Sequence, residues 1–315
     1  MRQNKVVYRG RIEQIPIYLG KCFRGLIYQD DWKVIPMAAV ISALVAFVAC
    51  GNFCKTMEGT MYGALALTFV CIWNGLFNSV QVICRERDIV KREHRAGMHI
   101  SSYIAAHMIY QAFICALQSA VMIEICLLAK VPFPANGLMT PWFTVDIAIA
   151  FFMISYASDM LGLLVSAFAR TTTTAMTVMP FMLIIQLLFS GFMFDLQGFA
   201  LKLTNLTISR WGINSLCSLS DYNSQPMVSL WNQLMKLQDV SVFGIKPVKE
   251  AAIYISENGL KDTFLQESAK YNQNVNYVYS VDHIQKCWLI LLGFALLFAA
   301  LAVVLLKGID KDTRG

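Results

Sequence analysis

The chain has 315 residues, of which 57% are hydrophobic and only 15% are charged, and its formal net charge is +6. Soluble globular domains usually contain about a quarter charged residues, so this composition argues against a soluble protein. The basic residues are gathered in a few short segments, which argues against a nucleic-acid-binding surface. We therefore expect an integral membrane protein, with membrane lipids and no nucleic acid among its partners.

Apolar residues form continuous runs of about 20 residues, the length that an α-helix needs to cross a hydrocarbon core of about 30 Å. Strands of a membrane barrel would instead alternate apolar and polar residues over about ten positions. The runs predict an all-α integral membrane protein with six transmembrane helices. These helices are expected at 34–50, 61–84, 102–129, 143–169, 175–194 and 287–306.

Residues 14–33 mix apolar side chains with Lys21, Arg24, Asp30 and Asp31, a pattern typical of an amphipathic helix that lies in the membrane interface. The segment lacks the pattern of a signal peptide, so we expect the start of the chain to stay inside the cell. The sequence thus predicts an N-terminal amphipathic elbow helix before the first span.

Lys and Arg are frequent before the first span, between the second and third spans, and after the sixth. Positive loops stay on the cytoplasmic side, so both termini are expected in the cytoplasm and the protein in the cell (plasma) membrane. Five parts are predicted: a cytoplasmic N-terminus with the interfacial helix (1–33), transmembrane helices one to five (34–194), an extracellular loop domain (195–286), transmembrane helix six (287–306) and a cytoplasmic tail (307–315).

The charged segment after the second span contains Glu86 and Glu93, which are seven positions apart, then Gly97 as an expected helix end. A Ser-Ser-Tyr sequence at 101–103 opens the third span. Beyond the fifth span, a Ser-Gly pair at 190–191 is followed by Arg-Trp-Gly at 210–212. In this order, the motifs resemble those of ABC-2 type permeases of the G subfamily of ABC transporters, and the resemblance covers nearly the whole chain.

The resemblance implies the permease half of an ATP-driven exporter, which moves an amphipathic or lipid-like substrate out of the cytoplasmic leaflet. It also implies a second permease protomer, identical or different, and an ABC nucleotide-binding domain, separate or fused. The chain has no Gly-x-x-x-x-Gly-Lys-Ser/Thr phosphate loop. No cofactor is therefore expected in this chain, and the resemblance implies that ATP and Mg are bound by the partner ATPase domain.

If residues 85–96 are helical, Asp88 can pair with Arg92 and with Arg85, while Glu86 and Glu93 share one face and are available to cations of a partner. The resemblance makes this segment a cytoplasmic coupling helix against the nucleotide-binding domain. The simpler interpretation is a solvated charged loop that only sets the topology. The candidate coupling residues are Glu86, Asp88, Arg92, Glu93 and Gly97.

Three acids lie in or near predicted spans. Asp159 is the deepest, and since an unpaired charge in a membrane is costly, it should face the bundle or a wet cavity. It has either a substrate or gating role, or a structural hydrogen bond to Ser155, Ser158 or another span. Asp146 and Glu124 lie nearer to span ends and are expected to be hydrated, and Glu124 is a further candidate for a substrate or gating role.

The fifth span carries large apolar side chains that the resemblance would place along an apolar route or a gate between two protomers. Lipid-facing or packing residues would show the same pattern. The candidates are Phe181, Leu187, Leu188, Phe189 and Phe192.

Two other classes of function remain open at this stage. A membrane-embedded enzyme would need paired catalytic groups, and Asp159 lacks an evident second member. A non-transporting receptor would use the extracellular domain alone. The histidines and cysteines show no metal-ligand spacing, so no metal site and no catalytic residue are predicted.

Overall fold

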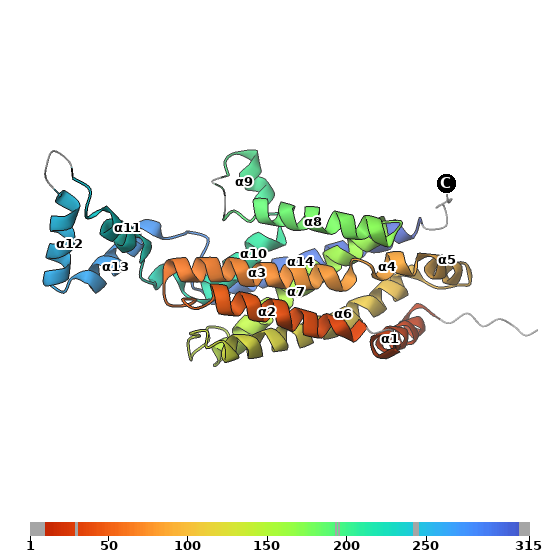
Figure 1. Ribbon diagram of the computed structural model, residues 1–315. Helices are drawn as coiled ribbons and strands as arrows, with labels where there is room; N and C mark the ends of the chain where they lie inside the picture. The colour runs from red at the N-terminus through yellow and green to blue at the C-terminus, as the bar shows by residue number, and fades with distance from the viewer. Residues whose placement is uncertain (1–9, 29–30, 193, 195, 242–245, 309–315) are drawn as a thin grey trace, which may run out of the picture.

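The computed structural model describes residues 10–28, 31–192, 194, 196–241 and 246–308, and over these residues it is helical, with one isolated bridge between Asn136 and Trp142 in place of a sheet. Six apolar helices lie side by side in an elongated bundle (Figure 1). They are α2 (Val34–Ala49), α3 (Met57–Ser79), α6 (Ile100–Leu128), α7 (Phe143–Phe168), α8 (Thr172–Leu188) and α14 (Val281–Leu306).

Four helices in the described part of the chain are long and apolar enough to cross a membrane: α3 with its short continuation α4 (Val82–Arg85), α6, α7 and α14. The predicted first and fifth spans are apolar helices too, but α2 has 16 residues and α8 has 17. A helix of 16 residues rises only about 24 Å. The polar turn Asp31–Lys33 delays the start of α2, and the turn at Gly191, with a φ of +74°, follows the end of α8.

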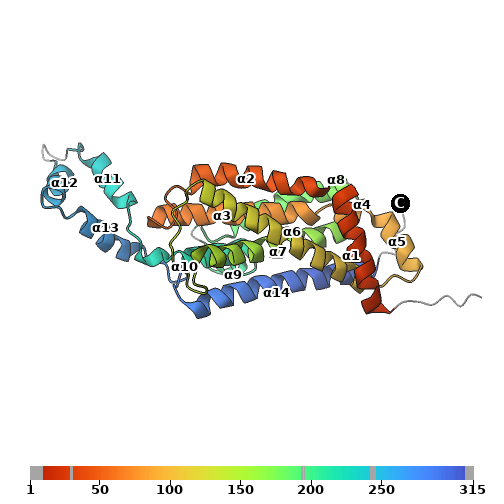
Figure 2. The ribbon, with the colours of Figure 1, turned by 90° about the horizontal axis from the view of Figure 1, so that it is seen from below.

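Helix α1 (Arg11–Tyr28) lies across the end of the bundle, beside the short helix α5 (Arg87–Arg95) (Figure 2). Its outward face exposes apolar side chains such as Ile12, Ile27 and Tyr28. A helix therefore occupies the segment predicted as amphipathic, and it begins three residues earlier than the sequence indicated. Its orientation across the bundle is compatible with a helix that follows a membrane surface.

Helices α3 and α7 form the closest contact in the core. A Cβ atom at Gly75 would lie 2.2 Å from the backbone oxygen of Ser155, and one at Gly162 would lie 2.9 Å from that of Leu76. Neither position can hold a larger residue unless the two helices separate. Helix α7 also packs against α6, α10 (Ile208–Leu219) and α14, so it is the central helix of the bundle.

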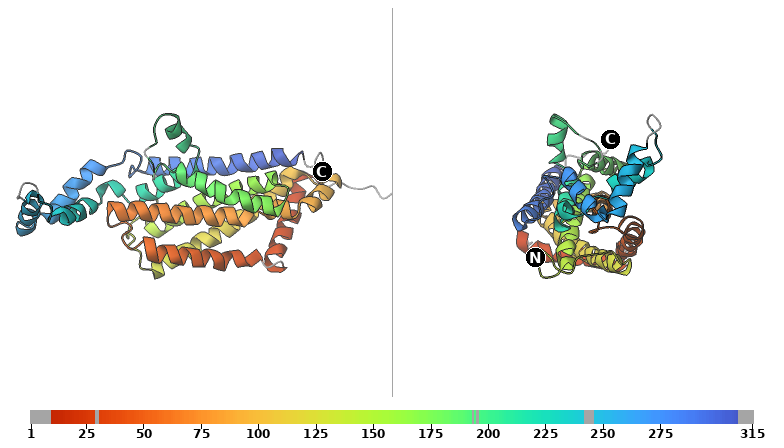
Figure 3. Two further views of the ribbon diagram at one scale, coloured as in Figure 1. Left: turned by 45° about the horizontal axis from the view of Figure 1, so that its top comes forward. Right: turned by 90° about the vertical axis from the view of Figure 1, so that its left-hand side faces the viewer.

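The segment predicted as a separate outer domain divides into two parts. Helix α10 packs inside the bundle against α3, α7 and α14, and Ile208, Ile213 and Leu216 are almost completely buried. Three further helices, α11 (Ser229–Leu237), α12 (Pro247–Glu257) and α13 (Lys261–Ala269), project beyond the opposite end of the bundle from α1 and α5 (Figure 3). The short α9 (Phe199–Thr204) precedes α10.

The projecting helices are joined to the bundle through the first turn of α3. Glu58 accepts hydrogen bonds from the backbone N–H groups of Val228 (3.2 Å) and Ser229 (2.6 Å), where α11 begins. A carboxylate at a helix N-terminus satisfies free N–H groups and complements the helix dipole. The backbone N–H of Met57 also donates to the oxygen of Pro226 at 3.1 Å.

The prediction that Asp146 is hydrated is wrong. Its side chain is fully buried and accepts hydrogen bonds from the backbone N–H groups of Leu138 (2.8 Å), Met139 (2.8 Å) and Thr140 (2.9 Å). The loop before α7 folds back over the start of the helix, and its backbone N–H groups donate to the carboxylate in place of water. This carboxylate therefore organises a loop and does not face solvent.

We expect Gly75→Val to lower the stability of the bundle by about 1–3 kcal/mol or more, because the added side chain must push α7 away from α3. Thermal unfolding of the purified protein in detergent measures the effect. Gly293→Val in α14 is the matched control, since a Cβ there would meet no atom within 4 Å. Equal melting temperatures for the two variants would contradict the close α3–α7 contact.

Candidate functional site

Helices α4 and α5 are attached to the C-terminal end of α7. The backbone N–H groups of Ile83 and Cys84 donate to the Ser166 hydroxyl oxygen at 2.9 and 3.1 Å. The Arg87 guanidinium donates to the backbone oxygens of Ala167 (3.0 Å) and Ala169 (3.1 Å). The last carbonyls of a helix lack partners within the helix, and an arginine there satisfies them and complements the dipole. The charged segment is thus fixed to the central helix.

Helix α5 ends where the sequence predicts, at the turn that contains Gly97. This residue has a φ of +105°, a conformation that residues with a Cβ adopt at a cost. The N–H of Met98 donates to the oxygen of Glu93 at 3.0 Å and closes the turn. Glycine is therefore needed here for the sharp reversal from α5 into α6.

A buried glutamine on α1 holds this turn. The Gln14 side chain donates to the backbone oxygen of Gly97 at 3.2 Å and accepts from the N–H of His99 at 2.8 Å. The Ser102 hydroxyl, part of the Ser-Ser-Tyr motif, donates to the oxygen of Arg11 at 2.7 Å. Gln14 is not among the site residues predicted from the sequence. In the sequence it is only one polar residue on the inner face of an amphipathic helix, which does not indicate a role.

Lys21 of α1 lies between the two glutamates of the charged segment. Its Nζ atom is 2.9 Å from Glu86 Oε2 and 3.8 Å from Glu93 Oε1, and the three side chains are about one-fifth to one-third exposed. Burial raises the pKa of Tyr18 to about 12, and the negative charge of Glu93 adds to this effect. Glu86 and Glu93 do share one face, as predicted, but this face meets α1 within the same chain instead of being available to a partner.

The opposite face of α5 is exposed and carries Asp88, Ile89 and Arg92. At so exposed a position, the predicted pair between Asp88 and Arg92 would gain only a few tenths of a kcal/mol, so it can add little to the stability of the helix. One side of α5 is therefore fixed to α1 and α7, and its other side is exposed.

Asp159 faces the interior of the bundle, as predicted, and is fully buried. Its Oδ2 atom accepts from Cys115 (3.3 Å) and from Asn78 (3.5 Å), and the side-chain amides of Asn78 and Gln118 pair reciprocally at 2.9 and 3.0 Å. Of the partners predicted for Asp159, the structure shows other spans, through Cys115 and Asn78, whereas the Ser158 hydroxyl has no partner among the described residues and neither has Asp159 Oδ1. The carboxyl group thus connects α7 to α3 and α6.

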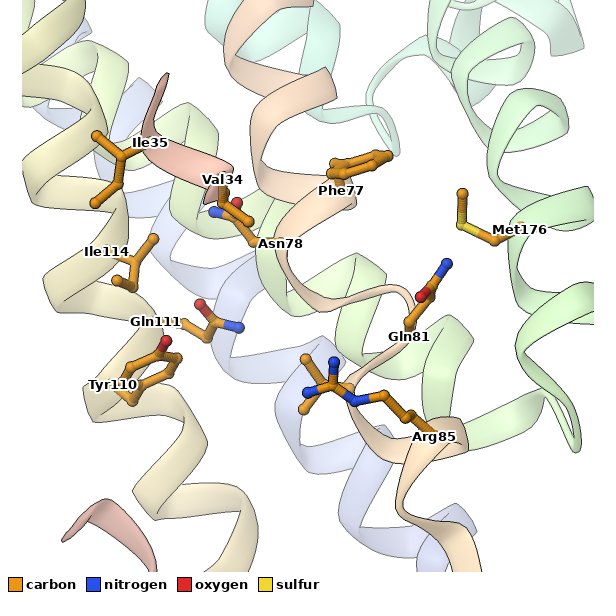
Figure 4. Close-up of a pocket in the computed structure, with 11 residues that line it drawn as sticks. Val34, Ile35, Phe77, Asn78, Gln81, Arg85, Tyr110, Gln111, Ile114 and Met176 are labelled. Atoms are coloured by element: carbon orange, nitrogen blue, oxygen red, sulfur yellow. The ribbon is translucent and has the colours of Figure 1, made fainter. Parts of the chain in front are cut away.

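A cavity of about 180 Å³ lies next to this network, where α2 begins and α4 follows α3. Figure 4 shows that its side chains come from α2, α3, α4, α6 and α8 and that the Arg85 guanidinium points from α4 towards α6. The cavity is lined by Val34, Ile35, Phe77, Asn78, Gln81, Val82, Arg85, Tyr110, Gln111, Ile114 and Met176.

A second, smaller cavity of about 60 Å³ lies between α1, α4 and α6. It contains Lys21 and Glu86, and it shares Val82, Arg85 and Tyr110 with the larger cavity. The two cavities are therefore neighbours that share part of their walls. Arg85 stands at their boundary.

The remaining predicted residues lie apart from this cavity. Glu124 is exposed on α6, and neither it nor the five apolar residues named on or after α8 line the cavity. Phe181 and Leu188 are exposed, and Phe192 makes an edge-to-face contact with Tyr62 of α3 at 5.6 Å. Leu187 and Phe189 are half-buried.

The two parts of the second motif meet at the far end of α8. A Cβ at Gly191 would lie 3.7 Å from a guanidinium nitrogen of Arg210. The backbone N–H of Ser209 donates to the side-chain oxygen of Gln186 at 3.0 Å, and its hydroxyl donates to that residue's backbone oxygen at 2.5 Å. Ser209, next to the motif, therefore fixes the start of α10 to the end of α8.

The family model for ABC-2 type transporters matches residues 20–219, which include α2 to α10 and all of this site except the first part of α1, where Gln14 lies. The chain is also similar to the ABC transporter ATP-binding/permease protein Rv1747 of Mycobacterium tuberculosis (strain ATCC 25618 / H37Rv), with 27% identity over 155 residues. That alignment covers 48% of this chain and 18% of the relative, so the chain spans well under half of the relative's length. With apolar helices able to cross a membrane and a family match over most of its length, the chain belongs to the ABC-2 type transporter family.

Proposed function

We propose that this chain, the transmembrane part of an ABC transporter, is the permease half of an ATP-driven exporter that moves an amphipathic or lipid-like substrate out of the cytoplasmic leaflet. The observation that carries the proposal is that α5 is attached to the bundle on one face and exposed on the other. One face is fixed to α1 and α7, and the other exposes Asp88, Ile89 and Arg92 to a partner. ATP and Mg would be bound by an ABC nucleotide-binding domain, on a separate or fused chain.

Force on the exposed face of α5 would reach the membrane helices by two routes. Arg87 transmits displacement to the end of α7 through its two hydrogen bonds. Lys21 and Gln14 transmit it to α1, which packs against α6. Because each route consists of short contacts between rigid helices, α5 can act as a coupling helix and α1 as the elbow helix that follows it.

The proposed topology has six spans, with both termini and α5 in the cytoplasm and α11–α13 outside. The basic residues in and around α1, at Arg85 and in α5 support it, because such segments remain on the cytoplasmic side. α2 and α8 are short for a full crossing, and a bilayer thins around short helices at a modest cost. The plasma membrane is the proposed location.

The exposed apolar faces of α3 and α8 support a dimer of permease protomers. Trp73 and Phe77 on α3, and Phe181 and Leu188 on α8, are all at least one-third exposed. A second protomer, identical or different, would cover them, and the substrate would pass along the interface. In this proposal Phe181, Leu187, Leu188, Phe189 and Phe192 form part of the route or gate.

The topology predicts opposite labelling of two introduced cysteines. With Arg92→Cys, a membrane-impermeant maleimide should react only after the cells are permeabilised, because α5 lies inside. With Tyr271→Cys, whose position is 94% exposed near α13, the reagent should react with intact cells. The unmodified chain, whose own cysteines are buried or half-buried, gives the background. Labelling of the Arg92→Cys variant in intact cells would contradict the proposed function.

Lys21→Met should uncouple ATP hydrolysis from substrate movement in the complex with the ATPase, because Glu86 and Glu93 then lose their cation on α1 and repel each other. Coupling contacts of this kind typically change the linked process by about 2- to 30-fold. We expect ATPase activity to persist while transport per ATP falls by such a factor, and Glu93→Ala should act in the same direction.

Arg24→Met is the matched control, because it removes a cation from the exposed side of the same helix. An equal loss in both variants would show that α1 contributes only surface charge. If the complex needed neither Lys21 nor Glu93 and the helices α11–α13 alone retained the activity, a receptor function would replace the transporter.

A further inference from the structure

The larger cavity combines one charged side chain with amides and an apolar wall. Among the described residues that line it, Arg85 alone is charged, and Asn78, Gln81 and Gln111 supply carboxamides. Val34, Ile35, Phe77, Ile114 and Met176 supply the apolar wall. A site with a cation at one side and hydrocarbon at the other suits a molecule that is anionic at one end and apolar at the other.

The amides differ in what they can still bind. Asn78 is held by Gln118 and Asp159, and the Gln111 amide nitrogen donates to Ser79 at 2.9 Å. The Gln81 side chain, in contrast, has no hydrogen-bond partner among the described residues. Gln81 and Arg85 lie one turn apart around α4, and both line the cavity, so an amide N–H and a guanidinium border the same space.

The size of the cavity limits its contents. A volume of about 180 Å³ is enough for a phosphate or carboxylate with a few methylene groups, but not for a whole lipid. The rest of the bound lipid would have to lie outside the cavity. It can leave the cavity beside Phe77, which lines the cavity and is 36% exposed on α3. Trp73, one turn further along α3, is 41% exposed. Hydrocarbon chains can follow this aromatic surface.

We propose that the cavity binds the anionic headgroup of a membrane amphiphile, with Arg85 and Gln81 on its oxyanion and the chains along Phe77 and Trp73. This inference rests on the proposed function and narrows its substrate class to acidic lipids or lipid-like acids. Arginine suits the role because its planar guanidinium binds phosphate or carboxylate oxygens in pairs. Neutral amphiphiles of equal chain length should bind more weakly.

The test uses the full transporter with its ATPase in nanodiscs that contain phosphatidylglycerol and phosphatidylcholine with identical chains. Native mass spectrometry then measures which lipid stays bound to the complex. We expect the unmodified complex to retain phosphatidylglycerol preferentially and Arg85→Gln to reduce that preference about tenfold, since a charge-assisted hydrogen bond is lost. Arg85→Lys should keep part of it, and Gln81→Leu should weaken it without changing the charge.

Arg170→Gln is the control, because Arg170 lies at the same end of the bundle but lines a different surface hollow. An unchanged preference in both Arg85→Gln and Gln81→Leu would overturn the inference. Displacement of the lipid by millimolar inorganic phosphate would also overturn it, since the site would then bind a free anion. Folding of each variant is checked by its melting temperature, and Gln81→Leu keeps the test decisive if Arg85→Gln does not fold.

The two proposals fail in distinguishable ways. If the complex moves amphiphiles with ATP but lipid preference is independent of Arg85 and Gln81, the headgroup site is wrong and the exporter stands. If lipid preference depends on Arg85 but no amphiphile moves with ATP, the exporter is wrong and the headgroup site stands.

Discussion

The rest of the structure depends on the close crossing of α3 and α7, which only glycine permits at Gly75 and Gly162. With these two helices in contact, Asn78 on one can reach Asp159 on the other, and α4, which follows α3, lies beside Ser166. Because lipid offers no hydrogen bonds, such polar groups must find partners inside the bundle. The crossing thus fixes both the buried network and the place where the charged segment begins.

α5 has two anchors within the chain, and the proposed coupling role depends on both. Its hydrogen bonds to the end of α7 come from Arg87, and its ion pairs to α1 come through Lys21 from Glu86 and Glu93. A charged loop that served only to set topology would not need a buried glutamine to hold its final turn, as Gln14 does. Both anchors are short-range contacts. In the proposed function, a displacement of α5 would therefore also displace α1 and the end of α7.

Long apolar runs made the helical class and the central helices predictable from the sequence, an amphipathic pattern did so for α1, and a glycine marked the end of α5 correctly. Residue patterns could not show that Asp146 caps a loop or that Asp159 bonds to Cys115, because those contacts depend on how the helices and loops pack. The same holds for Lys21, whose partners lie 65 or more residues away along the chain. The sequence places α10 in an outer domain because the residues around it in the sequence are mostly polar, so its apolar face does not stand out. The cavity at Arg85 is lined by residues of α2, α3, α4, α6 and α8, so no single segment could reveal it.

The carboxylate of Glu58 has a consequence for how the two ends of the molecule communicate. It joins α11 to the first turn of α3, and α3 continues to Ser79, beside the start of α4. If the proposed coupling tilts α3 from the nucleotide side, the Glu58 contact passes the tilt on to the projecting helices. In the proposed topology, an antibody raised against α11–α13 would act as an external sensor of the catalytic cycle, with an affinity that differs between nucleotide states.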